Sequence, residues 1–204
     1  MGSDAGSNRR EFLKGAAAGT AALALTAASQ RRVLGANDRI SIGIIGCGQR
    51  GFGAHMTGVH KYAEEHNIEI TAVCDVWTEY RERAAAQVQE WYGRPPRTFS
   101  NYEELVALED VDAVMIATPD FQHCGQLEAA AKTGKDAYCE KPLAMNMKEL
   151  KSACDAVKAA GIVVQIGTQL RSTPGAQGCK KLLETGALGT VSRVEQFRNG
   201  SKPN

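Results

Sequence analysis

The feature that most constrains the fold is a run of β-forming residues that leads directly into a Gly-x-Gly-x-x-Gly pattern. Residues 40–45 (Ile-Ser-Ile-Gly-Ile-Ile) precede glycines at positions 46, 48 and 51. This pattern predicts a buried parallel strand, a tight turn and a helix N-terminus whose free N–H groups can hold a pyrophosphate. A helix-compatible run at 54–65 follows, and a second expected strand at 69–75 ends in Asp75.

Asp75 is placed to complete a dinucleotide site. It lies 24 positions after Gly51, near the roughly 20 expected for the carboxylate that binds the adenosine ribose 2′-OH. A Gly-rich turn beside a surface aspartate is the alternative, since a chain with 21 glycines contains chance matches. That alternative does not account for the strand, the helix and the acid together. The expected cofactor-binding residues here are Gly46, Cys47, Gly48, Gln49, Arg50, Gly51 and Asp75.

The same aspartate favours NAD over NADP as the cofactor. A carboxylate hydrogen-bonds a 2′-OH but repels a 2′-phosphate. Residues 76–78 (Val-Trp-Thr) offer no cation in its place. Arg81 and Arg83 lie further along the next expected helix and keep NADP open as the second choice.

The nucleotide half alternates between strand and helix patterns, which is typical of a doubly wound α/β domain. The apolar run at 111–117 has the length of a central parallel strand. Further strands are expected at 97–99, 136–139 and 162–166, and helices at 77–91, from about 102, at 121–133 and at 147–160. The predicted fold class is α/β, with a doubly wound parallel-sheet Rossmann domain followed by the start of a truncated α+β C-terminal domain.

Lys141 is the most informative polar residue at the expected carboxyl edge of the sheet, where ligands bind in such folds. It follows a strand and stands between Glu140 and Pro142. A lysine there can hydrogen-bond a substrate hydroxyl or the nicotinamide ribose, stabilise a developing alkoxide or take part in proton transfer. A surface ion pair with Glu140 fits the spacing equally well.

The histidines have unequal prospects for chemistry. His123 lies four residues after Pro119, which follows Thr118 at the end of the 111–117 strand. It can contact the ribose or a substrate, or it can simply cap the loop. The histidines at 55, 60 and 66 have no partner at a suitable spacing and are expected on the surface.

Composition gives no indication of a nucleic-acid partner or a metal centre. Lys plus Arg is 24 and Asp plus Glu is 23, so no strong field of either sign attracts a polyanion. None of the six cysteines forms Cys-x-x-Cys or has a histidine at zinc spacing. Cys47, Cys74 and Cys139 are expected as small buried apolar residues, although Cys139, two positions before Lys141, leaves a reactive thiol as the lesser alternative.

The N-terminus has the features of an export signal. Arg9-Arg10 is followed by Glu-Phe-Leu-Lys, an apolar run at 15–28 and small residues at 27–28. This predicts a twin-arginine (Tat) signal, and residues 1–36 are expected to be signal and linker. The run is too short for a membrane span. Export by the Tat machinery to the periplasm or cell envelope, where no free NAD(H) pool exists, implies a tightly held and internally recycled cofactor.

These segments together resemble the Gfo/Idh/MocA oxidoreductase family. The shared pieces are the glycine pattern at 46–51, Thr118-Pro119 with His123, Glu140-Lys141-Pro142, and Gly-Thr-Gln-Leu-Arg at 167–171 with Pro174. The resemblance runs from about Asp38 to the end. It implies hydride transfer between a CH–OH group of a sugar, glycoside or cyclitol and a bound nicotinamide.

The resemblance also implies roles for individual residues. Lys141 would be the active-site lysine acting on the substrate, and His123 the second catalytic candidate and a cofactor contact. Thr118, Pro119, Glu140 and Lys141 are expected on the nicotinamide side, and Arg171 is expected to orient the substrate. Some exported relatives are NAD-dependent glycosidases that act by transient oxidation and elimination. They carry Val in place of this lysine, so Lys141 argues against that alternative; a non-catalytic nucleotide-binding fragment is the other.

In this family a second, mostly antiparallel domain serves substrate binding and dimerisation. Here residues 173–186 are expected to form a connecting helix and 191–197 the first strand of that sheet. One exposed strand cannot form a domain, so we expect a Rossmann domain at 37–167 and an incomplete substrate domain at 168–204. The catalytic base is expected beyond Asn204, and the full-length enzyme is expected to be a homo-oligomer. The chain alone is expected to bind nucleotide weakly and not to turn over.

Overall fold

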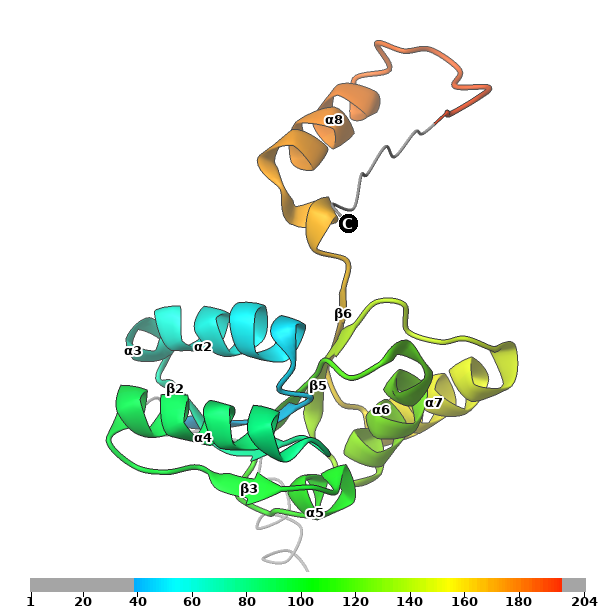
Figure 1. The fold of residues 1–204 in the computed structure, drawn as a ribbon. Coiled ribbons are helices and arrows are strands. Elements are labelled where there is room, and N and C mark those ends of the chain that lie inside the picture. The colour runs from blue at the N-terminus through cyan, green and yellow to red at the C-terminus, as the bar shows by residue number, and fades with distance from the viewer. Residues whose placement is uncertain (1–38, 196–204) are drawn as a thin grey trace, which may run out of the picture.

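The structure is a computed structural model that describes residues 39–195 (Figure 1). Residues 1–38, which include the predicted signal, and 196–204 lie outside the described part. The strands are β1 (Ile40–Ile45), β2 (Ile68–Cys74), β3 (Arg97–Phe99), β4 (Ala113–Ile116), β5 (Asp136–Glu140) and β6 (Val164–Gly167). The helices are η1 (Gly51–Met56), α2 (Thr57–Lys61), α3 (Ala63–His66), α4 (Thr78–Tyr92), α5 (Tyr102–Val106), η2 (Asp120–Gln122), α6 (His123–Lys132), α7 (Met147–Ala160), η3 (Gln169–Ser172) and α8 (Pro174–Glu184).

The strands form one six-stranded sheet in the order β3-β2-β1-β4-β5-β6. Every neighbouring pair is parallel. The chain moves outward from β1 through β2 and β3, then returns to β4 beside β1 and moves outward in the other direction. The predicted doubly wound fold is therefore confirmed. The strand order reverses between β1 and β4, and doubly wound sheets bind their ligands at the carboxyl ends of strands at such a reversal.

Helices cover the two faces of this sheet and bury two apolar clusters. On one face η1, α2 and α4 enclose side chains such as Ile44, Met56 and Val88. On the other face α5, α6 and α7 enclose side chains such as Ile45, Leu127 and Ala153. Neighbouring residues of β1 thus point into opposite clusters, which explains why this strand is apolar except at Ser41.

Local sequence signals set the ends of the longer helices. Asn146 caps α7 by accepting a hydrogen bond from the Glu149 N–H at 2.9 Å. The C-terminal ends of α4 and α7 lie at Gly93 (φ 73°) and Gly161 (φ 64°), in the left-handed region that favours glycine.

The C-terminal segment stands apart from the sheet. Helix α8 extends beyond the end of β6 in Figure 1, and none of its residues is buried. The strand expected at 191–197 is absent over 191–195, which have no regular secondary structure, and 196–197 lie outside the described residues. A strand needs a neighbour with which it can form hydrogen bonds. Residues 191–195 are not paired with any of the six strands of the described part. The division into domains at residue 167 stays a prediction.

The helix expected at 54–65 also differs from the structure. It starts earlier and is divided into η1, which has π-helical geometry, followed by α2 and α3. Within residues 39–195, no helix combines the length and apolar character that crossing a membrane requires.

Candidate functional site

The glycines of the turn after β1 meet different steric demands. Gly46 has φ 92°, and a Cβ there would lie 2.7 Å from the backbone carbon and oxygen of Ala117 in the loop after β4. A Cβ on Gly51 would lie 1.8 Å from the Gly46 carbonyl oxygen. A Cβ on Gly48 would meet only the Tyr80 ring at 3.5 Å, an ordinary contact. The protein's own backbone therefore explains Gly46 and Gly51, whereas no backbone contact explains Gly48.

The Asp75 carboxylate connects this turn to the helix that follows β2. Its Oδ2 accepts a hydrogen bond from the Cys47 N–H at 2.7 Å, and its Oδ1 accepts one from the Trp77 N–H at 2.9 Å. The structure thus brings Asp75 to the glycine-rich turn, as the sequence predicts for a ribose-binding acid. Each carboxylate oxygen retains a lone pair for a further donor.

The two arginines that could support NADP are already engaged by the protein. Arg81 donates from Nη1 to the Asp75 backbone carbonyl at 2.7 Å. Arg83 donates from Nη2 to the Cys47 carbonyl at 3.1 Å, and its guanidinium lies 4.2 Å from the centre of the Phe52 ring. Both side chains therefore help to hold the turn and the end of β2.

On the other side of the strand reversal, His123 joins two loops. Its side chain is only 1% exposed. Nδ1 lies 2.7 Å from the Pro142 carbonyl oxygen and Nε2 lies 2.9 Å from the Thr118 carbonyl oxygen. Thr118 also donates from its hydroxyl to Gln126 at 2.6 Å. This geometry favours the simpler of the two sequence interpretations, in which His123 holds the loop.

Glu140 has the densest set of polar contacts at this edge. Its Oε1 accepts hydrogen bonds from Arg50 Nε at 2.7 Å and Gln169 Nε2 at 2.6 Å, and it lies 2.9 Å from His55 Nε2. Burial raises the pKa of Glu140, but the hydrogen bonds from Arg50 and Gln169 more than offset this and hold the pKa below its ordinary value. A buried carboxylate therefore links the glycine-rich turn to the segment after β6.

Two members of this group were not predicted as site residues. His55 was expected on the surface but is 6% exposed, and burial lowers its pKa. Gln169 was noted only for its place in the chain. The signal for His55 is its position four residues after Gly51, in the last turn of a helix that packs against the sheet. His60 is also away from open solvent, since its ring stacks on Trp91 at 4.3 Å, and His66 is exposed as expected.

Lys141 lies at the end of β5 and is exposed. The ion pair with Glu140 does not form; the backbone N–H of Lys141 instead donates to Glu140 Oε2 at 3.3 Å. Among the described residues its ammonium has no ion-pair partner, so it is accessible to a ligand at the nucleotide edge. The structure thus brings Lys141, Glu140 and the His123 loops to one place.

Cys47, Cys74 and Cys139 are buried, as expected. All six are free thiols. Burial raises the pKa of Cys139 to about 12, so the thiol near Lys141 is neutral and unreactive at ordinary pH. The pKa of Cys47 is raised to about 12 in the same way. In the part of the chain that the structure describes, no cluster of His, Cys, Asp or Glu could hold a metal ion.

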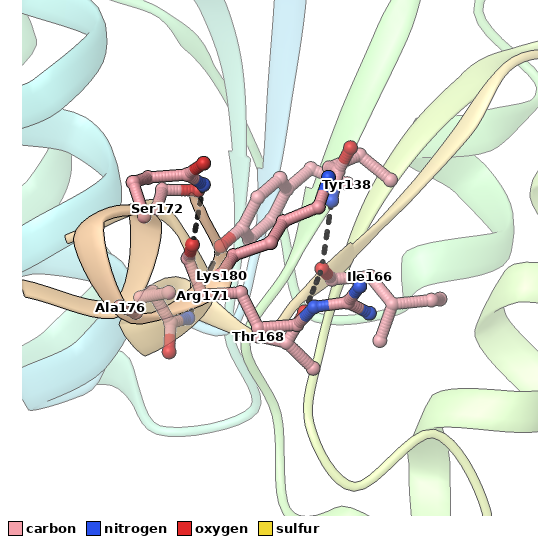
Figure 2. A pocket seen from close by; sticks show the side chains of 10 residues that line it. Tyr138, Ile166, Thr168, Arg171, Ser172, Ala176 and Lys180 are labelled. Carbon is pink, nitrogen blue, oxygen red and sulfur yellow. Dashed lines mark hydrogen bonds between the residues drawn. The ribbon is translucent and has the colours of Figure 1, made fainter. Parts of the chain in front are cut away.

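Arg171 lies in a pocket of about 820 Å³ between β6, η3 and α8 (Figure 2). The lining is rich in amides and hydroxyls, and Lys180 supplies a second cation. Tyr138 and Gln169 belong to the same wall and are hydrogen-bonded to each other at 3.1 Å. Because Gln169 also binds Glu140, the pocket adjoins the nucleotide edge.

Comparison with known sequences shows which family combines these features. Residues 40–168 match the Gfo/Idh/MocA family, described as an oxidoreductase family with an NAD-binding Rossmann fold. The chain belongs to this family. Residues 6–26 match the signal sequence of the twin-arginine translocation pathway, so the chain carries an export signal.

Several relatives in the Gfo/Idh/MocA family have names that suggest chemistry. The chain is 34% identical to "Glycosyl hydrolase family 109 protein 2" of Shewanella sp. (strain ANA-3), over 74% of this chain and 37% of that protein. It is 30% identical to "Inositol 2-dehydrogenase/D-chiro-inositol 3-dehydrogenase" of Lactiplantibacillus plantarum, over 76% of this chain and 43% of that protein. The chain therefore spans about 40% of the length of these relatives.

Solved structures agree on the fold. The WlbA dehydrogenase of Bordetella pertussis, in complex with NADH and UDP-GlcNAcA, has a TM-score of 0.65 and 27% identity over 72% of this chain and 43% of that one. The scyllo-inositol dehydrogenase of Lactobacillus casei, with bound NAD(H) and scyllo-inositol, has a TM-score of 0.66 and 24% identity over 74% and 43%.

Proposed function

We propose that this chain is part of an exported oxidoreductase. The enzyme would transfer a hydride between a CH–OH group of a sugar, glycoside or cyclitol and a tightly held NAD. The observation that carries this proposal is the Asp75 carboxylate hydrogen-bonded to the glycine-rich turn at the point where the strand order reverses. Named relatives act on cyclitols, as in the inositol dehydrogenase.

The residues of the turn fit a dinucleotide. The first N–H groups of a helix have no partner within it. Gly48 lies just before η1, and a Cβ on it would approach only the Tyr80 ring and no backbone, so a phosphate could come close to this residue. Asp75 keeps lone pairs for ribose hydroxyls. Arg81 and Arg83 each donate to a backbone carbonyl but keep further N–H donors, so the preference for NAD over NADP rests on the Asp75 carboxylate, which would repel a 2′-phosphate.

Lys141 would supply the chemistry of the substrate side. When bound, the nicotinamide of NAD accepts the hydride from the substrate carbon. The ammonium of Lys141 would donate a hydrogen bond to the substrate oxygen and stabilise the negative charge that develops there as the hydroxyl proton leaves. Arg171 and the pocket of Figure 2 would bind further hydroxyls or an anionic group of the substrate. The whole enzyme would be a homo-oligomer.

A second candidate is an NAD-dependent glycosidase that oxidises its substrate transiently and eliminates the aglycone. The relative named as a glycosyl hydrolase favours it, since it is 34% identical. Lys141 argues against it, because that group carries Val at the corresponding position. A non-catalytic nucleotide-binding protein is the third candidate.

One preparation can test these candidates. The gene, with all coding sequence in frame, is expressed in a Tat-competent bacterium and the protein is purified from the periplasmic fraction without added nucleotide. We expect mass spectrometry of the denatured protein to identify NAD(H) at about one per chain. NADP(H) instead would overturn the Asp75 argument, and an empty protein that binds no added nucleotide would overturn the oxidoreductase proposal.

Turnover then separates the two enzymes. We expect the bound NAD to be reduced by a sugar or cyclitol from a panel that includes myo-inositol, scyllo-inositol and levoglucosan, and the rate to fall about 100-fold or more, to a value that is still measurable, in Lys141→Met. Release of nitrophenol from nitrophenyl glycosides without net NADH would instead establish the glycosidase.

A further inference from the structure

The backbone of Lys141 is held on both sides by side chains that come from distant parts of the chain. Its upstream neighbour is Glu140, whose carboxylate is 4% exposed. Its downstream neighbour is Pro142, whose carbonyl oxygen faces His123 Nδ1 at 2.7 Å. The ammonium of Lys141 is carried on a four-carbon stem, so the backbone of residue 141 sets the point from which the ammonium can reach a ligand.

The upstream anchor joins three segments at one carboxylate. Arg50 comes from the glycine-rich turn and lies 90 residues before Glu140. Gln169 comes from η3 and lies 29 residues after it. Hydrogen bonds to a charged carboxylate are about twice as strong as those between neutral groups, and the Lys141 N–H donates to the other oxygen of the same carboxylate. Residue 141 is therefore fixed to the nucleotide turn from the upstream side.

The downstream anchor joins the loop after β5 to the loop after β4. His123 Nε2 lies 2.9 Å from the Thr118 carbonyl oxygen, opposite its contact with Pro142. Because carbonyl oxygens only accept, a neutral imidazole can donate to one of them and a protonated imidazole to both. His123 is 1% exposed, so water does not reach its ring nitrogens.

We propose that Glu140 and His123 are positioning residues that together fix Lys141 relative to the bound nucleotide. Neither side chain touches the substrate; each acts through the backbone of residues 140–142. The proposal rests on the function proposed above for Lys141. A shift of about 1 Å in a reacting group costs on the order of 100-fold in rate, so loosening either anchor would slow hydride transfer.

A buried carboxylate near the amino end of the parallel strands supplies a matched control. Glu69 is also a buried carboxylate, 1% exposed, and accepts hydrogen bonds from Arg94 at 2.7 Å on both oxygens. It also pairs with Arg39. Glu69 lies at the start of β2, far along the strand from Asp75, which follows its carboxyl end. Glu69→Gln therefore makes the same chemical change as Glu140→Gln without touching the nucleotide edge.

The test is a double-mutant cycle in the whole enzyme, with NAD and a sugar or cyclitol that is turned over. We expect Glu140→Gln and His123→Gln each to lower kcat by about 10- to 100-fold. In the Lys141→Ala background the same changes should have no further effect, because their action requires the lysine. His123→Asn, which keeps an amide donor near the Nδ1 position, should retain more activity than His123→Gln. Equal losses with and without Lys141 would overturn the proposal, and Glu69→Gln should leave kcat within about twofold.

A second measurement separates this proposal from the role of Lys141 itself. If Lys141→Ala leaves hydride transfer intact, the proposed function of that lysine is wrong. The positioning is then decided by hydrogen exchange on the 204-residue chain. Backbone amides at 118–123 and 140–143 should exchange faster in Glu140→Gln and His123→Gln but not in Glu69→Gln, and unchanged exchange in both segments would overturn it.

Discussion

At the scale of single residues, two glycines of one turn are needed for different reasons. A methyl group on Gly51 would overlap the Gly46 carbonyl oxygen, at 1.8 Å, and no side-chain movement can relieve a clash with backbone. A methyl group on Gly48 would reach only the Tyr80 ring at 3.5 Å. The folded chain thus requires Gly51, whereas only a bound ligand gives a reason for Gly48.

We therefore expect Gly51→Ala and Gly48→Ala to have different effects. Gly51→Ala should lower the free energy of unfolding by about 1–3 kcal/mol, because the turn and the first helix must move apart. Gly48→Ala should change stability by no more than about 0.5 kcal/mol but weaken NAD binding about tenfold. Urea denaturation and titration of tryptophan fluorescence with NAD would measure both quantities. An unchanged NAD affinity in Gly48→Ala would show that the pyrophosphate does not approach this residue.

At the scale of elements, the two helices with side-chain caps on either side of β6 contribute differently to the fold. Helix α7 is capped by Asn146 and packs Ala153 into the core. Helix α8 is capped by Thr173, whose hydroxyl accepts from the Ala176 N–H at 3.4 Å, but buries none of its residues. Equivalent capping chemistry therefore acts on a helix that belongs to the core and on one that does not.

Removing each cap should show this difference. Asn146→Ala is expected to lower the free energy of unfolding by about 1 kcal/mol, the usual cost of a lost N-cap. Asn146→Asp, which keeps the acceptor, should restore it. Thr173→Ala should leave the unfolding of the sheet unchanged and reduce only the helicity of α8. Equal losses from Asn146→Ala and Thr173→Ala, measured by urea denaturation, would mean that α8 unfolds together with the sheet.

The elements also show how far the sequence could predict the structure. Strands, glycine stops and the turn after β1 follow from local patterns, and Asp75 follows from a spacing that the motif defines. The π-helical start of the first helix could not be predicted, because no local sequence pattern distinguishes it from an ordinary helical turn. The contacts of Glu140 were also missed: they join Arg50 and Gln169 across 90 and 29 residues, and no local pattern records such a pairing.

At the scale of the whole molecule, buried charged groups at both edges of the sheet couple stability to pH. The hydrogen bond from Arg94 lowers the pKa of Glu69, and those from Arg50 and Gln169 lower the pKa of Glu140 against the effect of burial. Such carboxylates stabilise the fold above their unfolded pKa, near 4.5, and lose that contribution as the pH falls through their folded pKa. Burial lowers the pKa of His55 from 6.5, so protonation below that pH favours the unfolded chain.

Glu69, Glu140 and His55 therefore all lower the free energy of unfolding as the pH falls. We expect the free energy of unfolding of the 204-residue chain to be nearly constant from pH 8 to about 7, to fall below about pH 6.5 as His55 becomes protonated in the unfolded chain, and to fall further below about pH 5 as the two carboxylates do. Urea denaturation at half-unit intervals of pH would measure this. His55→Gln should remove the upper part of the decline, whereas Glu79→Gln, at an exposed residue of α4, should leave the curve as it is. A curve that is flat between pH 7 and pH 4 would contradict this account.

The connection between Arg50 and Glu140 also affects the order of events during synthesis. The first half of the nucleotide edge leaves the ribosome long before Glu140, and Gln169 follows later still. Parallel sheets built from such distant pairings form slowly, and the Tat pathway carries proteins that have already folded. The newly made chain would therefore complete its nucleotide site while still in the cytoplasm, where dinucleotide is abundant. Slow folding of this sheet would delay export, and the cofactor would bind during that delay.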